Sequence, residues 1–324
     1  MSGPLVAVTD HVFANLEPTE RALARLGADV RLAEAKTPEA ILAVGREADG
    51  MIVCYADVTA GIIEELEKCQ VIARTGIGVD NVDVAAATRA GIVVTNVREY
   101  CDDEVSDHAM ALLLALVRKV PFLNEKVRSG TWGAGSAKPI HRIRGKVLGL
   151  VGFGAIPRQV AVKAHGFGMD VQASDPYVDA DTYASHGVRG VDLDELLSTS
   201  DYISVHAPLT DETHNMFNAA AFSRMKRDAY LVNTARGPLV DVEALVDALD
   251  AGEIAGAGLD VLPEEPPADD LRLLGRDDVL VTPHVGFYSE DSMTDLQAKA
   301  AEQVALVLSG EDPLYPVNAE ALGK

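Results

Sequence analysis

The sequence is poor in cysteine, tryptophan and lysine. Its 324 residues include 3 cysteines and 1 tryptophan, and only 10 of its 28 basic residues are lysine. Three irregularly spaced cysteines exclude a disulfide framework and a paired-cysteine metal site, so we expect a reducing compartment and no bound metal. The longest apolar run, 109–117, is too short for a membrane span, and the first residues lack the pattern of a secretory signal. A cytoplasmic protein is therefore expected.

Acidic residues greatly outnumber basic ones. The chain has 50 acidic and 28 basic residues and a formal net charge of −22 at pH 7. This surplus repels the phosphates of nucleic acids and anionic lipid headgroups, so neither nucleic acid nor a membrane is an expected partner. Acidic doublets such as Asp102-Asp103 and Asp269-Asp270 also leave open an adaptation to high salt.

The pattern of apolar residues predicts two α/β domains, because one hydrophobic core rarely organises more than about 300 residues. Short β-like runs alternate with helical stretches in two series, which is typical of parallel βαβ units. Residues 104–120, between the two series, predict a buried helix, and residues 289–310 predict another. The expected strands are 5–9, 51–55, 71–74, 92–96, 147–151, 170–174, 202–206, 230–233, 256–259 and 279–282.

A glycine-rich turn follows the strand expected at 147–151. Gly152 and Gly154 would let a pyrophosphate approach main-chain N–H groups at the start of the next helix. Pro157 replaces the third glycine of the pattern, and the first turn of a helix tolerates it because N–H groups there have no intrahelical acceptor. Asp175 follows about 20 residues later, where a carboxylate binds ribose hydroxyls and repels a 2′-phosphate. These residues predict NAD rather than NADP, although an ordinary βα turn and a capping aspartate remain alternatives.

Three further segments place polar residues after expected strands, where open α/β sheets build their sites. The segments are 233–237, 260–266 and 282–284, and they contain Arg236, Glu265 and His284. Each segment alone is more often a solvated loop or holds a structural residue. Together they supply a guanidinium that holds an anion, an imidazole that transfers a proton and a carboxylate that orients the imidazole, as carbonyl reduction requires.

The order of these motifs resembles that of the D-isomer-specific 2-hydroxyacid dehydrogenase family. The shared motifs are residues 76–83 (GIGVDNVD), the glycine turn, residues 233–237, Glu265-Pro266 and Thr282-Pro283-His284. The resemblance implies an α/β fold of two doubly wound parallel-sheet domains. A Rossmann NAD-binding domain, 101–289, would be inserted into a flavodoxin-like substrate domain, 1–100 and 290–324, with hinges near 98–101 and 287–290. Members are usually dimers, often through the long helix that begins here near Glu104, so a homodimer is expected, although the apolar density of this helix is equally compatible with simple burial.

The resemblance also implies the activity and the roles of individual residues. The chain would interconvert a 2-keto acid and a D-2-hydroxy acid, with NAD as cofactor. Arg236 would bind the substrate, His284 would donate or accept the proton, and Glu265 would be its partner. The backbone at Gly76, Ile77 and Gly78 would join Arg236 and His284 in binding the substrate. The expected NAD-binding residues are Gly152, Gly154, Ala155, Ile156, Asp175, His206, Ala207, Pro208, Thr234, Ala235, Arg236, Asp260 and His284.

Two alternatives to a 2-hydroxyacid dehydrogenase of unspecified substrate remain open. Residues 100–109 and 282–289 are similar to the branch that contains the C-terminal-binding-protein co-repressors, which predicts an NAD(H)-sensing interaction protein with little turnover. The phosphoglycerate dehydrogenase branch shares the same motifs. Its substrate carries a phosphate, for which the available cations are Arg74, Arg98, Arg142 and Arg144.

Other side chains are candidates for weaker reasons. Four aromatic residues are candidate selectors of the substrate side chain, with core packing as the alternative, above all for Trp132: Tyr100, Trp132, Phe287 and Tyr288. The remaining histidines are interpreted as structural or surface residues: His11, His108, His141, His165, His186 and His214.

Overall fold

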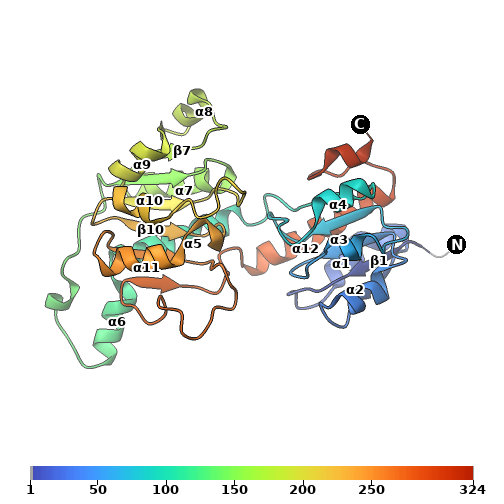
Figure 1. The fold of residues 1–324 in the computed structure, drawn as a ribbon, viewed down its shortest axis with the longest axis horizontal. Coiled ribbons are helices and arrows are strands. Elements are labelled where there is room, and N and C mark those ends of the chain that lie inside the picture. The colour runs from blue at the N-terminus through green and yellow to red at the C-terminus, as the bar shows by residue number, and fades with distance from the viewer. Residues whose placement is uncertain (1–2, 324) are drawn as a thin grey trace. The chain divides into compact units, whose positions relative to one another are not determined.

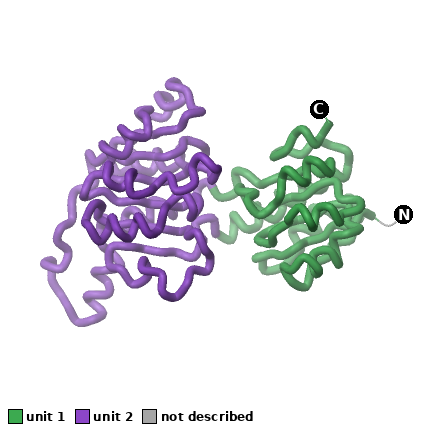
Figure 2. Tube along the Cα trace, viewed as in Figure 1, with its two compact units in different colours: residues 1–101, 289–324 green, residues 102–288 purple. Residues whose placement is uncertain are grey.

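The computed structural model describes residues 3–323 and divides into two compact units. Unit 1 contains residues 1–101 and 289–324, and unit 2 contains residues 102–288 (Figure 2). The chain therefore passes from one unit to the other twice, and each crossing lies one residue from the boundary expected from the sequence.

A five-stranded parallel sheet forms the centre of unit 1, in the strand order β2-β1-β3-β4-β5. This is the order of flavodoxin-like doubly wound sheets. The strands are β1 (Leu5–Val8), β2 (Asp29–Leu32), β3 (Gly50–Val53), β4 (Val71–Arg74) and β5 (Val93–Thr95). The helices are α1 (Glu17–Leu23), α2 (Pro38–Gly45), α3 (Ala60–Ile63), α4 (Val84–Arg89) and α12 (Glu290–Leu308), with short 3-10 helices η1 (Ala24–Leu26) and η4 (Ala319–Leu322).

Helices cover both faces of this sheet. Because side chains alternate between the two sides of a strand, Met51 and Val53 pack against α2 and α3, whereas Ile52 packs on the side of α1 and α12. Figure 1 shows α12, in orange-red, among the blue and cyan elements of the first hundred residues. The carboxyl-terminal segment therefore completes the core of unit 1.

A seven-stranded parallel sheet forms the centre of unit 2, in the order β12-β11-β10-β9-β6-β7-β8. Along the chain, β7 and β8 are added on one side of β6, and β9 to β12 are then added on its other side, as in Rossmann sheets. The strands are β6 (Val147–Val151), β7 (Asp170–Ser174), β8 (Arg189–Gly190), β9 (Tyr202–Val205), β10 (Tyr230–Asn233), β11 (Gly256–Leu259) and β12 (Val279–Val281). The helices are α5 (Asp102–Val117), α6 (Val120–Arg128), α7 (Ala155–Gly166), α8 (Ala180–Ser185), α9 (Leu193–Thr199), α10 (Ala219–Arg224) and α11 (Val242–Asp250), with η2 (Ala134–Ala137) and η3 (Gly237–Leu239).

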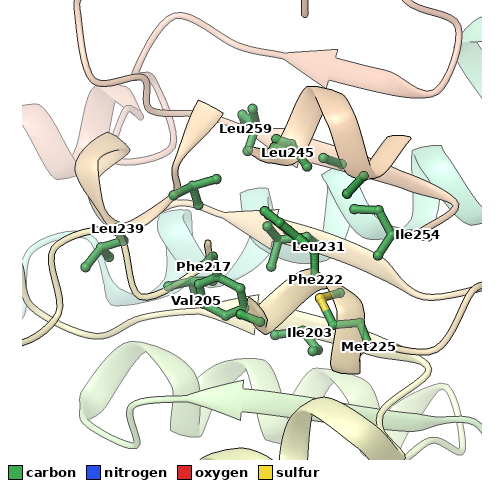
Figure 3. Packing of buried hydrophobic residues seen from close by; sticks show 14 of the residues in the cluster. Ile203, Val205, Phe217, Phe222, Met225, Leu231, Leu239, Leu245, Ile254 and Leu259 are labelled. Atoms are coloured by element: carbon green, nitrogen blue, oxygen red, sulfur yellow. The ribbon is translucent and has the colours of Figure 1, made fainter. Parts of the chain in front are cut away.

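Two apolar clusters enclose the sheet of unit 2. Leu148 and Leu150 of β6 pack with α5 and α7 on one face. Ile203 and Val205 of β9 pack on the other face with helices α9, α10 and α11, as Figure 3 shows for the residues around Phe222. Burial on both faces explains why these strands are nearly continuous apolar runs in the sequence.

The helix expected over 104–120 is shorter than predicted. It ends at Val117, and α6 starts at Val120 after Lys119, whose φ is 53°. Pro121 lies in the first turn of α6, where its missing N–H is not needed. The same proline could not have continued α5 without the loss of a main-chain hydrogen bond, so the chain breaks into two helices.

Candidate active site

The carboxyl ends of the unit 2 strands carry the predicted NAD-binding and catalytic residues. All paired strands of this sheet are parallel, so their carboxyl ends share one edge. Ligands of doubly wound sheets bind at this edge. The residues that follow the strands there are Gly152 after β6, Asp175 after β7, His206 after β9, Thr234 to Arg236 after β10, Asp260 after β11 and His284 after β12.

The glycine turn leaves the start of α7 open to a phosphate group. Gly152 has φ +90°, and a Cβ there would lie 3.0 Å from the carbonyl of His206. Gly154 caps α7 without a side chain, and a Cβ there would meet only open space. Pro157 lies in the first turn of the helix, ahead of the bond from Arg158 N to Gly154 O. The turn therefore offers backbone N–H groups at the positive end of the helix dipole.

Asp175 is clamped beside this turn. One carboxylate oxygen accepts a hydrogen bond from the Phe153 amide at 2.8 Å, and the other accepts one from the Tyr177 amide at 2.9 Å. The side chain is half-buried, and each oxygen retains capacity for a further donor. Its position fits recognition of the ribose hydroxyls by an ionised carboxylate.

Two of the predicted NAD-binding residues, His206 and Thr234, follow neighbouring strands of this edge. Burial lowers the pKa of His206 to about 3, so its ring is neutral, and its Nε2 lies 2.8 Å from the hydroxyl of Ser204. The Thr234 hydroxyl is buried without a hydrogen-bond partner in the described residues. An unsatisfied buried hydroxyl is costly, which fits a site that is completed when a polar group binds.

Arg236 is presented by an extended segment after β10. Its carbonyl accepts a hydrogen bond from Asn233 Nδ2 at 2.8 Å, and its Nη1 donates to the carbonyl of Ala235 at 2.7 Å. A Cβ on the next residue, Gly237, would lie 2.0 Å from the carbonyl carbon of Leu262. Only glycine therefore lets the Arg236 segment approach the loop that leads to Glu265.

His284 and Glu265, for which the sequence predicts an acid–base role, lie within hydrogen-bond distance of each other. Nδ1 of His284 lies 2.7 Å from Oε2 of Glu265, and Oε1 of Glu265 accepts a hydrogen bond from the Leu262 amide at 2.9 Å. Burial tends to raise the pKa of Glu265, but the hydrogen bonds from His284 and Leu262 outweigh it and lower that pKa. An ionised carboxylate only accepts, so Nδ1 carries a proton and Nε2 is the nitrogen left to exchange a proton with a ligand.

Asp260 anchors the turn that carries His284. Its Oδ1 accepts from the Thr282 hydroxyl at 2.6 Å and the Val285 amide at 3.0 Å, and its Oδ2 accepts from the Gly286 amide at 2.8 Å. Burial alone would raise its pKa, but these bonds and one from His108 hold the pKa of Asp260 at about 2. Both oxygens of the predicted cofactor residue are thus engaged with the protein, and its role in NAD binding stays a prediction.

His108 contacts this anchor, which the sequence did not indicate. Its Nε2 lies 2.9 Å from the Thr282 hydroxyl and 3.3 Å from Oδ1 of Asp260. The sequence interpretation placed His108 among structural or surface residues. No local motif could have found this contact, because 174 residues separate His108 from Thr282.

The predicted substrate-binding loop belongs to unit 1. Gly76 has φ +147°, and a Cβ there would lie 1.4 Å from Nη1 of Arg74, so the arginine side chain lies directly over the glycine. The carbonyl of Ile77 accepts a hydrogen bond from Asn96 Nδ2 at 2.7 Å, and the Ile77 side chain is exposed. Binding of a carboxylate by Gly76, Ile77 and Gly78 stays a prediction.

The remaining candidates differ widely in exposure. Tyr100 is buried, and burial raises the pKa of its hydroxyl, whereas the Trp132 side chain is 88% exposed. Arg98, Arg142 and Arg144 are exposed. Within residues 3–323 no helix is long and apolar enough to cross a membrane, and no group of three or more histidine, cysteine or acidic residues is placed to hold a metal ion.

The chain belongs to the D-isomer specific 2-hydroxyacid dehydrogenase family, whose NAD-binding domain is matched by residues 110–286. The matched residues all lie within unit 2. The family and the fold class predicted from the sequence are both confirmed.

Several named proteins are similar to the chain. The D-3-phosphoglycerate dehydrogenase of Methanocaldococcus jannaschii is 39% identical over 303 residues, which cover 91% of this chain and 57% of that protein. The glyoxylate reductase of Korarchaeum cryptofilum is 36% identical over 320 residues, 96% of each chain. The D-lactate dehydrogenase of Aquifex aeolicus, solved with NAD and lactic acid, has a TM-score of 0.86 and 30% identity over 94% of this chain and 96% of that one. The chain spans about half the length of the curated phosphoglycerate dehydrogenases it matches.

Proposed function

We propose that this protein is an NAD-dependent oxidoreductase that interconverts a 2-keto acid and a D-2-hydroxy acid. The observation that carries the proposal is the hydrogen-bonded pair of His284 and Glu265. His284 follows β12 at the same edge of the sheet at which the glycine turn follows β6 and Arg236 follows β10. Membership of the 2-hydroxyacid dehydrogenase family supports it. Unit 1 would serve as the substrate domain and unit 2 as the cofactor domain.

Arg236, His284 and Glu265 of unit 2 have separate roles in the proposed carbonyl reduction. Bound NADH would supply the hydride that adds to the carbonyl carbon. The guanidinium of Arg236 holds the substrate carboxylate and polarises the carbonyl oxygen. His284, doubly protonated before the step, gives the proton on Nε2 to that oxygen, which becomes the hydroxyl. Glu265 keeps the ring oriented and stabilises its positive charge until the transfer, and the reverse reaction returns the proton to Nε2.

The test is NADH oxidation with a panel of 2-keto acids. The panel contains glyoxylate, hydroxypyruvate, pyruvate, phosphohydroxypyruvate and bulkier apolar acids, because similar proteins include a glyoxylate reductase and phosphoglycerate dehydrogenases. We expect turnover with at least one of them and a product of D configuration by chiral chromatography. Tight NADH binding with no turnover across the panel would overturn the enzyme and favour the NAD(H)-sensing interaction protein.

A homodimer is part of the proposal. Val120 and Val127 of α6 are about half exposed, and Trp132 lies just beyond the helix. A cavity of about 480 Å³ is lined by residues from α5, α6 and β12, among them Leu116, Phe122 and Leu280. Apolar side chains and a cavity on adjoining elements fit a surface covered by a second copy. Sedimentation should give a dimer that Val120→Glu weakens, and a monomer at all concentrations would contradict it.

We also place the protein in the cytoplasm, as the sequence led us to expect. The structure records Cys54 and Cys69 as thiols, and burial raises the pKa of both, so neither is a reactive thiolate. Thiols of this kind suit a reducing compartment.

A further inference from the structure

His108 reaches the catalytic edge of unit 2 from helix α5. This helix packs against β10, β11 and β12, and His108 points to the anchor formed by Asp260 and Thr282. Its side chain is 23% exposed, and that of Asp260 is 3% exposed. The contact therefore lies at the border between solvent and a buried carboxylate.

The hydrogen-bond directions in this cluster can be deduced. The hydroxyl of Thr282 has a single hydrogen to donate. Its oxygen lies 2.6 Å from Oδ1 of Asp260, which belongs to an ionised carboxylate and can only accept. Thr282 therefore donates to Asp260 and can only accept from His108. Nε2 of His108 must carry the proton, and it donates to the Thr282 oxygen at 2.9 Å with a second acceptor, Oδ1 of Asp260, at 3.3 Å.

The ring of His108 also packs directly on the turn that carries His284. A Cβ on Gly286 would lie 2.9 Å from Oδ2 of Asp260 and 3.3 Å from Cδ2 of His108, so the glycine is enclosed by both side chains. His284 itself has φ 51°, and its amide donates to the carbonyl of Asp260 at 2.8 Å. A non-glycine residue keeps such a backbone conformation only where its surroundings enforce it.

We propose that His108 is a positioning residue for His284: its Nε2–H joins α5 to Thr282 and Asp260 and thereby holds the turn that presents the His284 ring. The inference rests on the proposed function in so far as His284 is the acid–base group of the reaction.

Three substitutions separate the donor from the bulk of the ring. His108→Gln places an amide N–H near the position of Nε2, His108→Asn places one near Nδ1, out of reach of Thr282, and His108→Leu fills the space without a donor. We expect kcat to fall on the order of 10-fold to 100-fold for the Leu and Asn variants, as a small misplacement of an acid–base group does. The Gln variant should keep most of the wild-type kcat, with the KM for the 2-keto acid and the Kd for NADH little changed in all three.

The outcomes decide between positioning and simple packing. Unchanged kcat in His108→Leu, or equal losses in the Gln and Leu variants with normal thermal unfolding, would overturn the proposal. Rescue by Gln alone would support it.

A second measurement does not depend on turnover. Ethoxycarbonylation of His284 by diethyl pyrocarbonate, followed by peptide mass spectrometry, reports how tightly the ring is held. We expect His284 to react several-fold faster in His108→Leu than in the wild type, and at the wild-type rate in His108→Gln. Equal rates in all proteins would overturn the positioning role, whereas a wild-type enzyme that reduces no 2-keto acid would overturn only the proposed function.

Discussion

Oε2 of Glu265 accepts the Nδ1–H of His284 across 2.7 Å, while Oε1 of the same carboxylate is held by the Leu262 amide. A carboxylate restrained at both oxygens cannot rotate freely, so it fixes the plane of the imidazole as well as its tautomer. The nitrogen opposite this contact, Nε2, is therefore directed away from Glu265.

Replacing His284 by Asn should abolish most of the turnover. Asn adopts a left-handed backbone readily, so the substitution removes the imidazole while it suits the turn. We expect kcat to fall by about 10²-fold to 10⁴-fold, the usual contribution of a general acid–base group. The Kd for NADH, measured by fluorescence, should stay close to that of the wild type. Turnover within tenfold of the wild type would show that another group transfers the proton.

Arg236→Lys should impair the enzyme although it keeps the charge. Lysine lacks the planar fork that binds a carboxylate through two parallel hydrogen bonds. We expect kcat/KM for the 2-keto acid to fall on the order of 100-fold, as it does when a group that stabilises a developing oxyanion is lost. The exposed Arg227 provides a matched control, since Arg227→Lys should leave the steady-state constants unchanged. Equal effects of the two substitutions would remove Arg236 from the site.

Asp175→Ala should weaken the preference for NADH over NADPH. The substitution deletes an acceptor for the ribose hydroxyls and a charge that repels a 2′-phosphate. Because one hydrogen bond to a charged group is worth about 1.5–3 kcal/mol, the ratio of the two dissociation constants should change about tenfold or more. Asp179→Ala, which removes an exposed carboxylate at the start of α8, is the control. A ratio unchanged by Asp175→Ala would refute the assignment.

Asp260 should make folding stability depend on pH in the acid range. Its pKa is about 2 in the folded protein and 3.8 ordinarily, so the folded state binds its proton less readily than the unfolded chain does. The carboxylate thus stabilises the fold by about 2 kcal/mol above pH 3.8, and this contribution disappears as the pH falls toward 2. Urea unfolding of the wild type and Asp260→Asn should show a stability difference that narrows over that range. A difference independent of pH would mean that the carboxylate is not held as described.

Much of the fold could be predicted because both sheets are buried on both faces. The strands at 71–74, 147–151, 170–174, 230–233 and 256–259 have the predicted bounds, and most of them are rich in buried small or apolar residues. Strand β2 escaped prediction because it is an edge strand, with the sequence DVRL and mostly exposed side chains. Its alternation of polar and apolar residues extends over only four positions, the shortest pattern that indicates a strand.

Some features of the site could likewise be predicted from the sequence, and others could not. The glycine turn and the residues after β10 and β12 could be found because their motifs are local. The anchoring role of Asp260 could not, because it depends on how α5 lies against β11 and β12. A sequence names His108 and Thr282 as separate residues, and only tertiary packing makes them neighbours.

At residue 284, the left-handed backbone favours one type of residue for stability, whereas the proposed catalysis requires another. Residues with a Cβ generally lose about 1–2 kcal/mol in this conformation, whereas Gly adopts it without that penalty. Selection for thermal tolerance alone would therefore drift toward sequences without an imidazole at residue 284. Engineers who seek a more robust variant of this protein should hold that position constant and look for gains elsewhere, because here greater stability and greater activity require different amino acids.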